Sequence, residues 1–179
     1  MNATSQPITM SQPGRWLALL RIVVGFYFAK ALWTKMTIGL MGGWLPLPMA
    51  SQRWIETMPQ IVAKQAAGNP ILWYKSFLEN TVLANPTLFA ELTAWGEVIT
   101  GLGLVLGLWA GIGALTGLSL VINYGLATQW MSPGQLGFHY VLVTCMLVFF
   151  LARSGREWGL DSWMAWRWGD RWFTKRPFA

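Results

Sequence analysis

The residues of this chain that could do chemistry are polar side chains set inside long apolar stretches. An ionisable side chain at the centre of a bilayer costs about 2.5 to 3.5 kcal/mol on insertion scales, so a residue of this kind is a functional candidate by default. A lysine and a glutamate can both remain ionised there if each neutralises the other. The candidates are Arg21, Lys30, Lys35, Glu91, Glu97, Asn123 and His139.

The depth of each residue along its helix predicts which of these side chains meet. At a rise of about 1.5 Å per residue, Lys35 and Glu91 lie near the boundary that faces the first loop, whereas Lys30 and Glu97 lie about 10 to 15 Å deep. Opposite charges therefore occur at matched levels. A spare donor among them could bind an anion or a quinone carbonyl.

Two further polar residues belong to the same outer half of the bundle. Asn123 falls near the middle of its span, and His139 lies about 8 Å from the loop side. We expect one polar pocket to collect these side chains. The predicted catalytic residues are Glu97 and Lys30, and the predicted substrate-binding residues are Lys35, Glu91, Asn123 and His139.

The faces of the first helix leave this pairing open. At 100° per residue, Lys30 lies about 180° from Arg21, whereas Arg21 and Lys35 share a face. If only one face looks inward, either Lys30 or the other two cations need a different partner. An alternative is that the charges merely lock the helices together, with Lys35 and Glu91 extending to the interface.

The composition indicates the elements that position these residues. Of the 179 residues, 54% are hydrophobic and 11% are charged, against roughly a quarter charged residues in soluble domains. This argues against a soluble enzyme. Segments of about twenty apolar residues can cross a bilayer, and they occur at 16–36, 87–109, 110–131 and 134–152. The predicted fold is an all-α integral membrane four-helix bundle.

The positive charge that follows the last span predicts the orientation. Lys and Arg are enriched on the cytoplasmic side of membrane proteins, so we expect both termini to be cytoplasmic, in a bacterial or archaeal cytoplasmic membrane. Residues 1–14 are predicted to be a flexible N-terminus. Residues 162–179 are predicted to be a basic, Trp-rich tail that lies on the membrane surface.

The loop 37–86 is too long for a plain connection. Pro59 and Asn69-Pro70 divide it, and amphipathic helices are expected at 51–57 and 71–83, the second with Trp73, Phe77 and Leu78 on its apolar stripe. Such helices lie in the interface plane. We interpret the loop as a helical lid over the pocket, and a surface spacer held down by tryptophans is an equal alternative.

A second cluster is predicted at the opposite end of the bundle. Arg21 lies about 8 Å inside that end, within reach of the segment after the fourth span. Asp161 or Glu157 could neutralise it. We interpret Arg21, Arg156 and Asp161 as a structural clasp.

The remaining composition excludes several kinds of site. A single cysteine, Cys145, rules out an intramolecular disulfide, a dithiol relay and a cysteine-ligated iron-sulfur cluster, and a single histidine rules out bis-histidine haem ligation. No metal site is evident. The basic residues lie between or after apolar segments instead of forming one basic face, so nucleic acid is not an expected partner.

Several motifs occur in a characteristic order. They are Arg21 with Gly25, Lys35, the run Trp73–Glu79, Leu88-Phe89-Ala90, Gly96-Glu97, Gly101–Gly107 and Gly155–Asp161. Over roughly residues 15–161 this pattern resembles the DoxX/DoxD family of small four-helix membrane proteins. The family landmarks fall on Arg21, Lys35, Glu97, Arg156 and Asp161.

The resemblance implies a membrane subunit of a quinone-linked oxidoreductase, with quinone as a bound substrate and thiosulfate as the donor class. A redox cofactor would then come from a partner, or the substrate and the quinone would react directly. The alternative is a non-catalytic accessory subunit of a larger respiratory or photosynthetic complex. Either reading expects the lipid bilayer and a partner subunit or a second copy as neighbours. A small solute carrier is disfavoured, because no inverted repeat relates the two halves.

Overall fold

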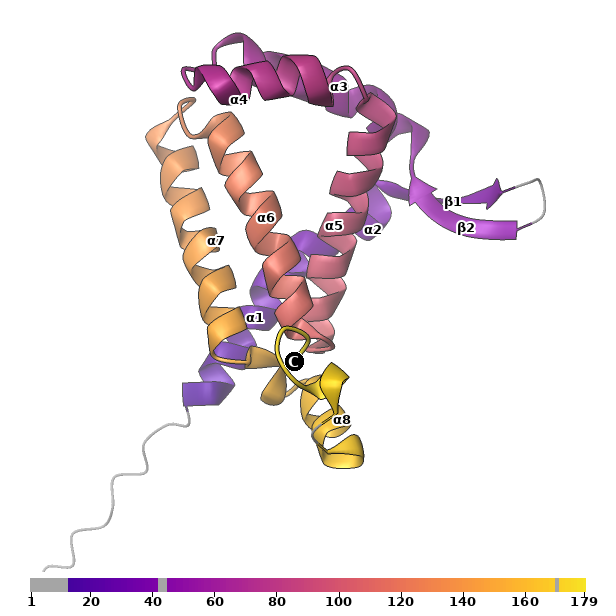
Figure 1. Ribbon diagram of the computed structural model, residues 1–179, viewed down its shortest axis with the longest axis vertical. Coiled ribbons are helices and arrows are strands. Elements are labelled where there is room, and N and C mark those ends of the chain that lie inside the picture. The colour runs from indigo at the N-terminus through magenta and orange to yellow at the C-terminus, as the bar shows by residue number, and fades with distance from the viewer. Residues whose placement is uncertain (1–12, 42–44, 170) are drawn as a thin grey trace, which may run out of the picture.

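The computed structural model describes residues 13–41, 45–169 and 171–179. Four helical stretches are long and apolar enough to cross a membrane: Pro13–Thr34, Pro86–Leu106, Ala110–Thr128 and Pro133–Leu151. They lie where the sequence predicts spans, and the prediction of an apolar helical bundle is confirmed. The first stretch consists of α1 (Pro13–Ala29) and α2 (Ala31–Thr34), and the others are α5, α6 and α7 (Figure 1). Of the predicted flexible N-terminus, residues 1–12 lie outside the described part.

Local sequence signals set the ends of the spans. Pro86 and Pro133 open α5 (Pro86–Leu106) and α7 (Pro133–Leu151), where a missing N–H costs nothing. Ser132 caps α7 by accepting a hydrogen bond from the Gln135 N–H at 3.2 Å. Gly107 ends α5 with φ 59°, so the chain turns directly into α6 (Ala110–Thr128).

Glycine lets α1 and α5 cross at backbone contact. A Cβ on Gly101 would lie 2.4 Å from the Ala29 nitrogen and 2.5 Å from its Cα. On the facing helix, a Cβ on Gly25 would lie 2.7 Å from the Val105 nitrogen. Small residues permit this approach in lipid, where no hydrophobic drive brings helices together. The crossing fixes which face of α1 looks inward.

A β-hairpin follows the first span, so the expectation of a wholly helical chain is wrong here. Strand β1 (Met36–Met41) pairs antiparallel with β2 (Leu45–Ala50), with Met36 opposite Ala50. Residues 36–50 include three glycines and two prolines, which disfavour a helix. The hairpin projects sideways from the bundle (Figure 1).

The rest of the loop forms a helical lid across one end of the bundle. It consists of α3 (Gln52–Ala67), α4 (Leu72–Phe77) and the π-helical segment η1 (Leu78–Val82) (Figure 1). The prediction that Pro59 divides the loop is wrong, because α3 continues through it. Its buried stripe of Met58, Val62 and Ala66 packs in one core cluster, which offsets the hydrogen bond that proline removes.

The apolar stripe of the second lid helix differs from the predicted one. Tyr74, Leu78 and Val82 are buried, whereas Trp73 is 65% exposed. The π-helical turn shifts the register between the two halves of this segment. Leu78 is buried as the pattern predicts, and Tyr74, four residues before it, shares this face, so tyrosine takes the inward position that the pattern assigned to Trp73.

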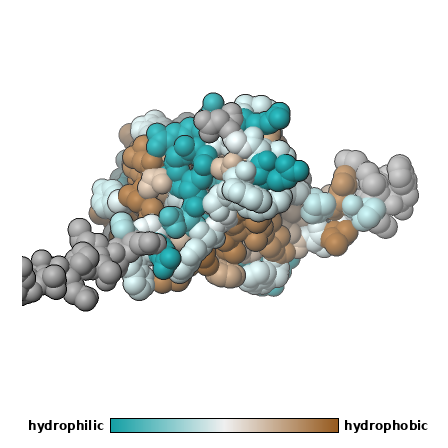
Figure 2. All heavy atoms as spheres, turned by 90° about the horizontal axis from the view of Figure 1, so that it is seen from below, coloured by the Kyte–Doolittle hydropathy of each residue, from teal (hydrophilic) through white to brown (hydrophobic). Residues whose placement is uncertain are grey.

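The opposite, tail end of the bundle is closed by the last residues. The segment consists of η2 (Ser154–Arg156), α8 (Leu160–Trp168) and η3 (Trp172–Thr174). The Gly111 N–H donates to the Phe178 carbonyl at 2.9 Å, so the tail folds back against α6 instead of only lying on a surface. Figure 2, seen from this end, shows hydrophilic residues gathered beside an apolar flank.

The predicted clasp residues meet at this end, but not as an ion pair. Arg21 is fully buried and its Nη2 donates to the Trp158 carbonyl at 3.2 Å. Asp161 is also fully buried and accepts from the backbone N–H groups of Trp109 (2.7 Å) and Ala110 (3.0 Å), which caps α6.

Burial raises the pKa of Asp161, although the two N–H groups and the charges of Arg21 and Arg156 oppose this shift. Arg156 itself donates through Nη2 to the Thr174 carbonyl and so holds η3 against the bundle. The clasp therefore joins α1, the α5–α6 turn and the tail.

The helix crossing predicts the effect of adding one methyl group. Gly101→Ala should lower the free energy of unfolding by about 1–3 kcal/mol, because the new Cβ meets the backbone of Ala29. Unfolding in mixed micelles measures this. Gly137→Ala is the matched control, since a Cβ there meets nothing within 4 Å. Equal stability of the two variants would contradict the close crossing.

The cap of α6 gives a second prediction. Asp161→Asn should lower the free energy of unfolding by about 1–3 kcal/mol, because the amide faces two backbone donors with one acceptor. The melting temperature in nanodiscs measures it. Glu157→Gln, at an exposed acid nearby, should change little. A loss no larger than that of the control would show that Asp161 does not hold the turn.

Candidate functional site

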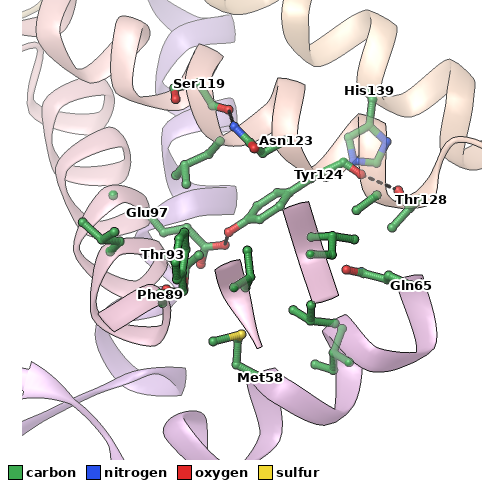
Figure 3. A pocket seen from close by; sticks show the side chains of 18 of the residues that line it. Met58, Gln65, Phe89, Thr93, Glu97, Ser119, Asn123, Tyr124, Thr128 and His139 are labelled. Carbon is green, nitrogen blue, oxygen red and sulfur yellow. Dashed lines mark hydrogen bonds between the residues drawn. The ribbon is translucent and has the colours of Figure 1, made fainter. Parts of the chain in front are cut away.

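A large pocket lies between the lid and the bundle. Its volume is about 870 Å³, and it is lined by residues of α3, α4, η1, α5, α6 and α7, with Tyr27 of α1 at its edge. Most of its wall is apolar, including Met58, Phe89 and Leu120. Figure 3 shows Glu97, Tyr124 and His139 directed into it from three different helices. The lid reading of the loop thus matches the position of α3 and α4 over this space.

An ion pair stands at one end of the pocket. Lys35 Nζ lies 2.9 Å from Glu97 Oε1, and the two side chains are 15% and 9% exposed. The ammonium group also lies 3.9 Å from the centroid of the Trp54 ring. Such a cation–π contact stabilises a partly desolvated cation. The lysine is held by α5 on one side and by the lid on the other.

A phenol completes this cluster. Tyr124 Oη donates to Glu97 Oε1 at 2.9 Å. The other oxygen, Oε2, is buried and no donor in the described part of the chain reaches it. A buried acceptor without a donor costs about 1–3 kcal/mol. The carboxylate therefore offers an unused acceptor beside the pocket.

Asn123 and His139 are two further polar residues of the pocket wall. His139 is 8% exposed, and its Nδ1 lies 2.7 Å from the Gln135 carbonyl oxygen. A carbonyl only accepts, so Nδ1 carries a proton, and in the tautomer with this single proton Nε2 is an acceptor. The Asn123 side chain donates to the Ser119 carbonyl at 2.8 Å and receives Tyr74 Oη at 3.3 Å.

Side chains of the lid are bonded to the bundle at several points. Trp54 Nε1 donates to the Ala90 carbonyl at 3.2 Å, and Asn69 Nδ2 donates to the Leu126 carbonyl at 2.9 Å. Tyr74 Oη donates to the Asn123 carbonyl at 2.8 Å. Burial raises the pKa of Tyr74 to about 12, so this hydroxyl keeps its proton at neutral pH. The lid is thereby fixed in a closed position.

Two predicted site residues lie elsewhere. Lys30 is exposed, and its Nζ lies over the outer Tyr27 ring at 4.0 Å. The expected pairing of Lys30 with Glu97 is wrong, because the face of α1 that carries Arg21 turns inward and Lys35 takes the carboxylate. Glu91 accepts the Ala50 N–H on both oxygens, at 2.9 and 3.0 Å, and so holds the end of the hairpin.

The sequence reasoning missed the aromatic members of the site. Tyr124 lies next to Asn123, and a phenol in the interior of an apolar span is a signal that could have been used. Trp54 gave no such signal, because its position depends on α3 crossing α5. Thr93, which accepts from Trp54 Nε1 at 3.3 Å, depends on the same crossing.

The charge of the pocket is nearly balanced. Of the Lys and Arg residues in the described ranges, Lys35 alone lines the pocket, and it is paired with Glu97. The described residues contain no group of three or more His, Cys, Asp or Glu that could hold a metal ion. The arrangement suits a largely apolar ligand that carries a few hydrogen-bonding atoms.

The ion pair predicts a non-additive pattern of stability. Lys35→Met should lower the free energy of unfolding by about 3–5 kcal/mol, because it leaves a buried carboxylate without a cation. The double variant Lys35→Met with Glu97→Gln should lose less than that single variant, since no charge is left unpaired.

Unfolding in mixed micelles measures this cycle. Lys75→Met is the control, because Lys75 lies 3.9 Å from Glu79 in an exposed pair that contributes about 1 kcal/mol at most. If Lys35→Met cost no more than Lys75→Met, the pair would not stabilise the lid end.

Comparisons of this chain with protein-family models, with curated proteins and with solved structures find no match.

Proposed function

We propose that the chain is a quinone-binding membrane subunit of an oxidoreductase and that the pocket under the lid holds the quinone. The observation that carries the proposal is the Lys35–Glu97–Tyr124 cluster on the wall of an apolar pocket of about 870 Å³. A quinone has an apolar ring and tail with polar oxygens on the ring. A mostly apolar wall with a few convergent polar groups is the kind of site that binds such a molecule.

The charge of the pocket favours a quinone over an anion. A dianion such as thiosulfate would need surplus positive charge, but Lys35 is already neutralised by Glu97 and Lys30 faces outward. We therefore propose the quinone as the occupant, with thiosulfate, the donor class that the DoxX/DoxD resemblance implies, as the reductant to be tested. Glu97 is the residue that we propose to exchange protons with the quinone.

The proposed orientation follows the positive charge. The basic residues after α7 lie at the tail end, so this end is proposed to face the cytoplasm and the lid the outer side. Quinones partition into the bilayer, and the spans expose apolar side chains along their length.

A second candidate function, that of a non-catalytic accessory subunit, is favoured by the hairpin. Residues 36–50 contain no charged side chain, and Ile38 and Met49 are 75% and 43% exposed. The hairpin extends away from the bundle (Figure 1). An exposed apolar element of this kind is typical of a contact with another protein.

Filling the pocket tests the proposed ligand. Ser119→Trp places a large side chain on the pocket wall and should weaken binding of a decyl-substituted benzoquinone by about tenfold or more. Tryptophan fluorescence in nanodiscs measures binding. Thr144→Trp is the matched control, on an exposed position of α7 outside the pocket lining. Unchanged binding by Ser119→Trp, with the fold intact, would place the quinone elsewhere.

An activity assay separates the two candidate functions. Thiosulfate-dependent reduction of quinone in nanodiscs, lost in Glu97→Gln while the protein stays folded, supports the oxidoreductase. Inactive protein that co-purifies in fixed stoichiometry with a large complex supports the accessory subunit.

A further inference from the structure

Several hydrogen-bond donors on the pocket wall are directed into the protein. Tyr124 Oη donates to Glu97. The side chains of Thr93 and Thr128 donate to carbonyl groups one turn earlier in their own helices, at 2.9 and 2.8 Å. Asn123 Nδ2 and His139 Nδ1 do the same, at 2.8 and 2.7 Å. Helical backbone carbonyls thus occupy the protons that these side chains could give to a ligand.

The unused positions of these groups are acceptors. Glu97 Oε2 is buried and no described donor reaches it. His139 Nδ1 faces a carbonyl oxygen, and in the tautomer with its single proton on Nδ1 the other nitrogen, Nε2, is an acceptor. In Figure 3 these two side chains lie on either side of Tyr124. A ligand that brings a donor can therefore satisfy Glu97 Oε2, and one that brings only acceptors cannot.

Lys35 differs from these side chains. Among the described Lys and Arg residues it alone lines the pocket, and its ammonium group is a charged donor. Its ammonium group has three N–H bonds, of which one is directed at Glu97 and the group as a whole lies against the Trp54 ring. It can serve an acceptor at one end of a ligand. A second acceptor at the other end would meet the lone pairs of His139 and Asn123.

We infer that the pocket selects the reduced form of its ligand, a hydroquinone, over the quinone. This inference rests on the proposed function. A hydroquinone presents two O–H donors, which can satisfy Glu97 and His139, whereas the two carbonyl oxygens of a quinone can only accept. A ligand that leaves a buried polar group of the site unpaired binds more weakly than one that pairs it, which makes such a site selective.

Three ligands of nearly equal size test the inference. They are a decyl-substituted benzoquinone, its hydroquinone prepared and kept under anaerobic conditions, and the dimethyl ether of that hydroquinone. Dissociation constants are measured in nanodiscs by tryptophan fluorescence. We expect the hydroquinone to bind about tenfold tighter or more than either of the others. The ether is informative because it keeps the shape and removes both donors.

A variant locates the preference. Glu97→Gln replaces the unpaired acceptor by an amide that can donate. The ratio of the dissociation constant of the quinone to that of the hydroquinone should therefore fall towards one. Glu79→Gln is the matched control, since Glu79 is exposed on the lid and does not line the pocket. It should leave the ratio unchanged, and the melting temperature checks that both variants are folded.

The outcomes distinguish this inference from the function on which it rests. Equal or tighter binding of the quinone, or equal binding of the ether, would overturn the selectivity and leave the quinone site standing. Failure of all three ligands to bind would overturn both. A preference that survives in Glu97→Gln would overturn the assignment of the acceptor to Glu97.

Discussion

The lid end of this molecule depends on neutralising one carboxylate in an apolar setting. Glu97 stands inside α5, where an unpaired charge would be costly, and Lys35 meets it from the junction of α2 and β1. Each partner draws in one more element, because Trp54 of α3 covers the lysine and Tyr124 of α6 bonds the glutamate. One ion pair thereby ties the first span, the lid, α5 and α6 around the pocket.

The tail end also contains buried charged side chains, Arg21 and Asp161, but they are not held by a direct ion pair with each other. Arg21 is fully buried without a direct carboxylate partner among the described ion pairs, and it packs against the backbone of the α5–α6 turn. A Cβ on Gly107 would collide with its Nη1 atom. The Asp161 carboxylate instead accepts hydrogen bonds from the N–H groups at the start of α6. Backbone atoms therefore pack around Arg21 at the tail end, whereas the described pocket lies at the lid end.

The comparison of sequence and structure separates what periodicity can predict from what it cannot. Length and apolarity predict the four spans, because a bilayer imposes both. The depth of Glu97, Asn123 and His139 along their helices correctly predicts that they line one pocket. The depth prediction fails for Lys30 because a helix face is chosen by packing, here by the crossing at Gly101. Backbone depth also does not account for the length of the Lys35 side chain, which reaches the deeper carboxylate of Glu97.

The lid could be predicted only in outline. A continuous α3 through Pro59, the π-helical turn after Phe77 and the hairpin at 36–50 all depend on contacts with distant segments. The Ala50 N–H, for example, is held by Glu91, which is far along the chain. Local propensity carries no information about such a bond, so Glu91 looked like a binding residue when it is an anchor for the hairpin.

The aromatic contact between α1 and α7 has a consequence for how a molecule would reach the pocket. The rings of Tyr27 and Phe138 meet edge to face with centroids 5.6 Å apart. Both rings line the pocket, and they are 43% and 42% exposed. Rotations of partly exposed side chains are fast, so this is a part of the pocket wall that side-chain motion alone can change. Raising the lid instead requires several hydrogen bonds to break, so the gap between α1 and α7 is the route into the pocket that costs fewer contacts.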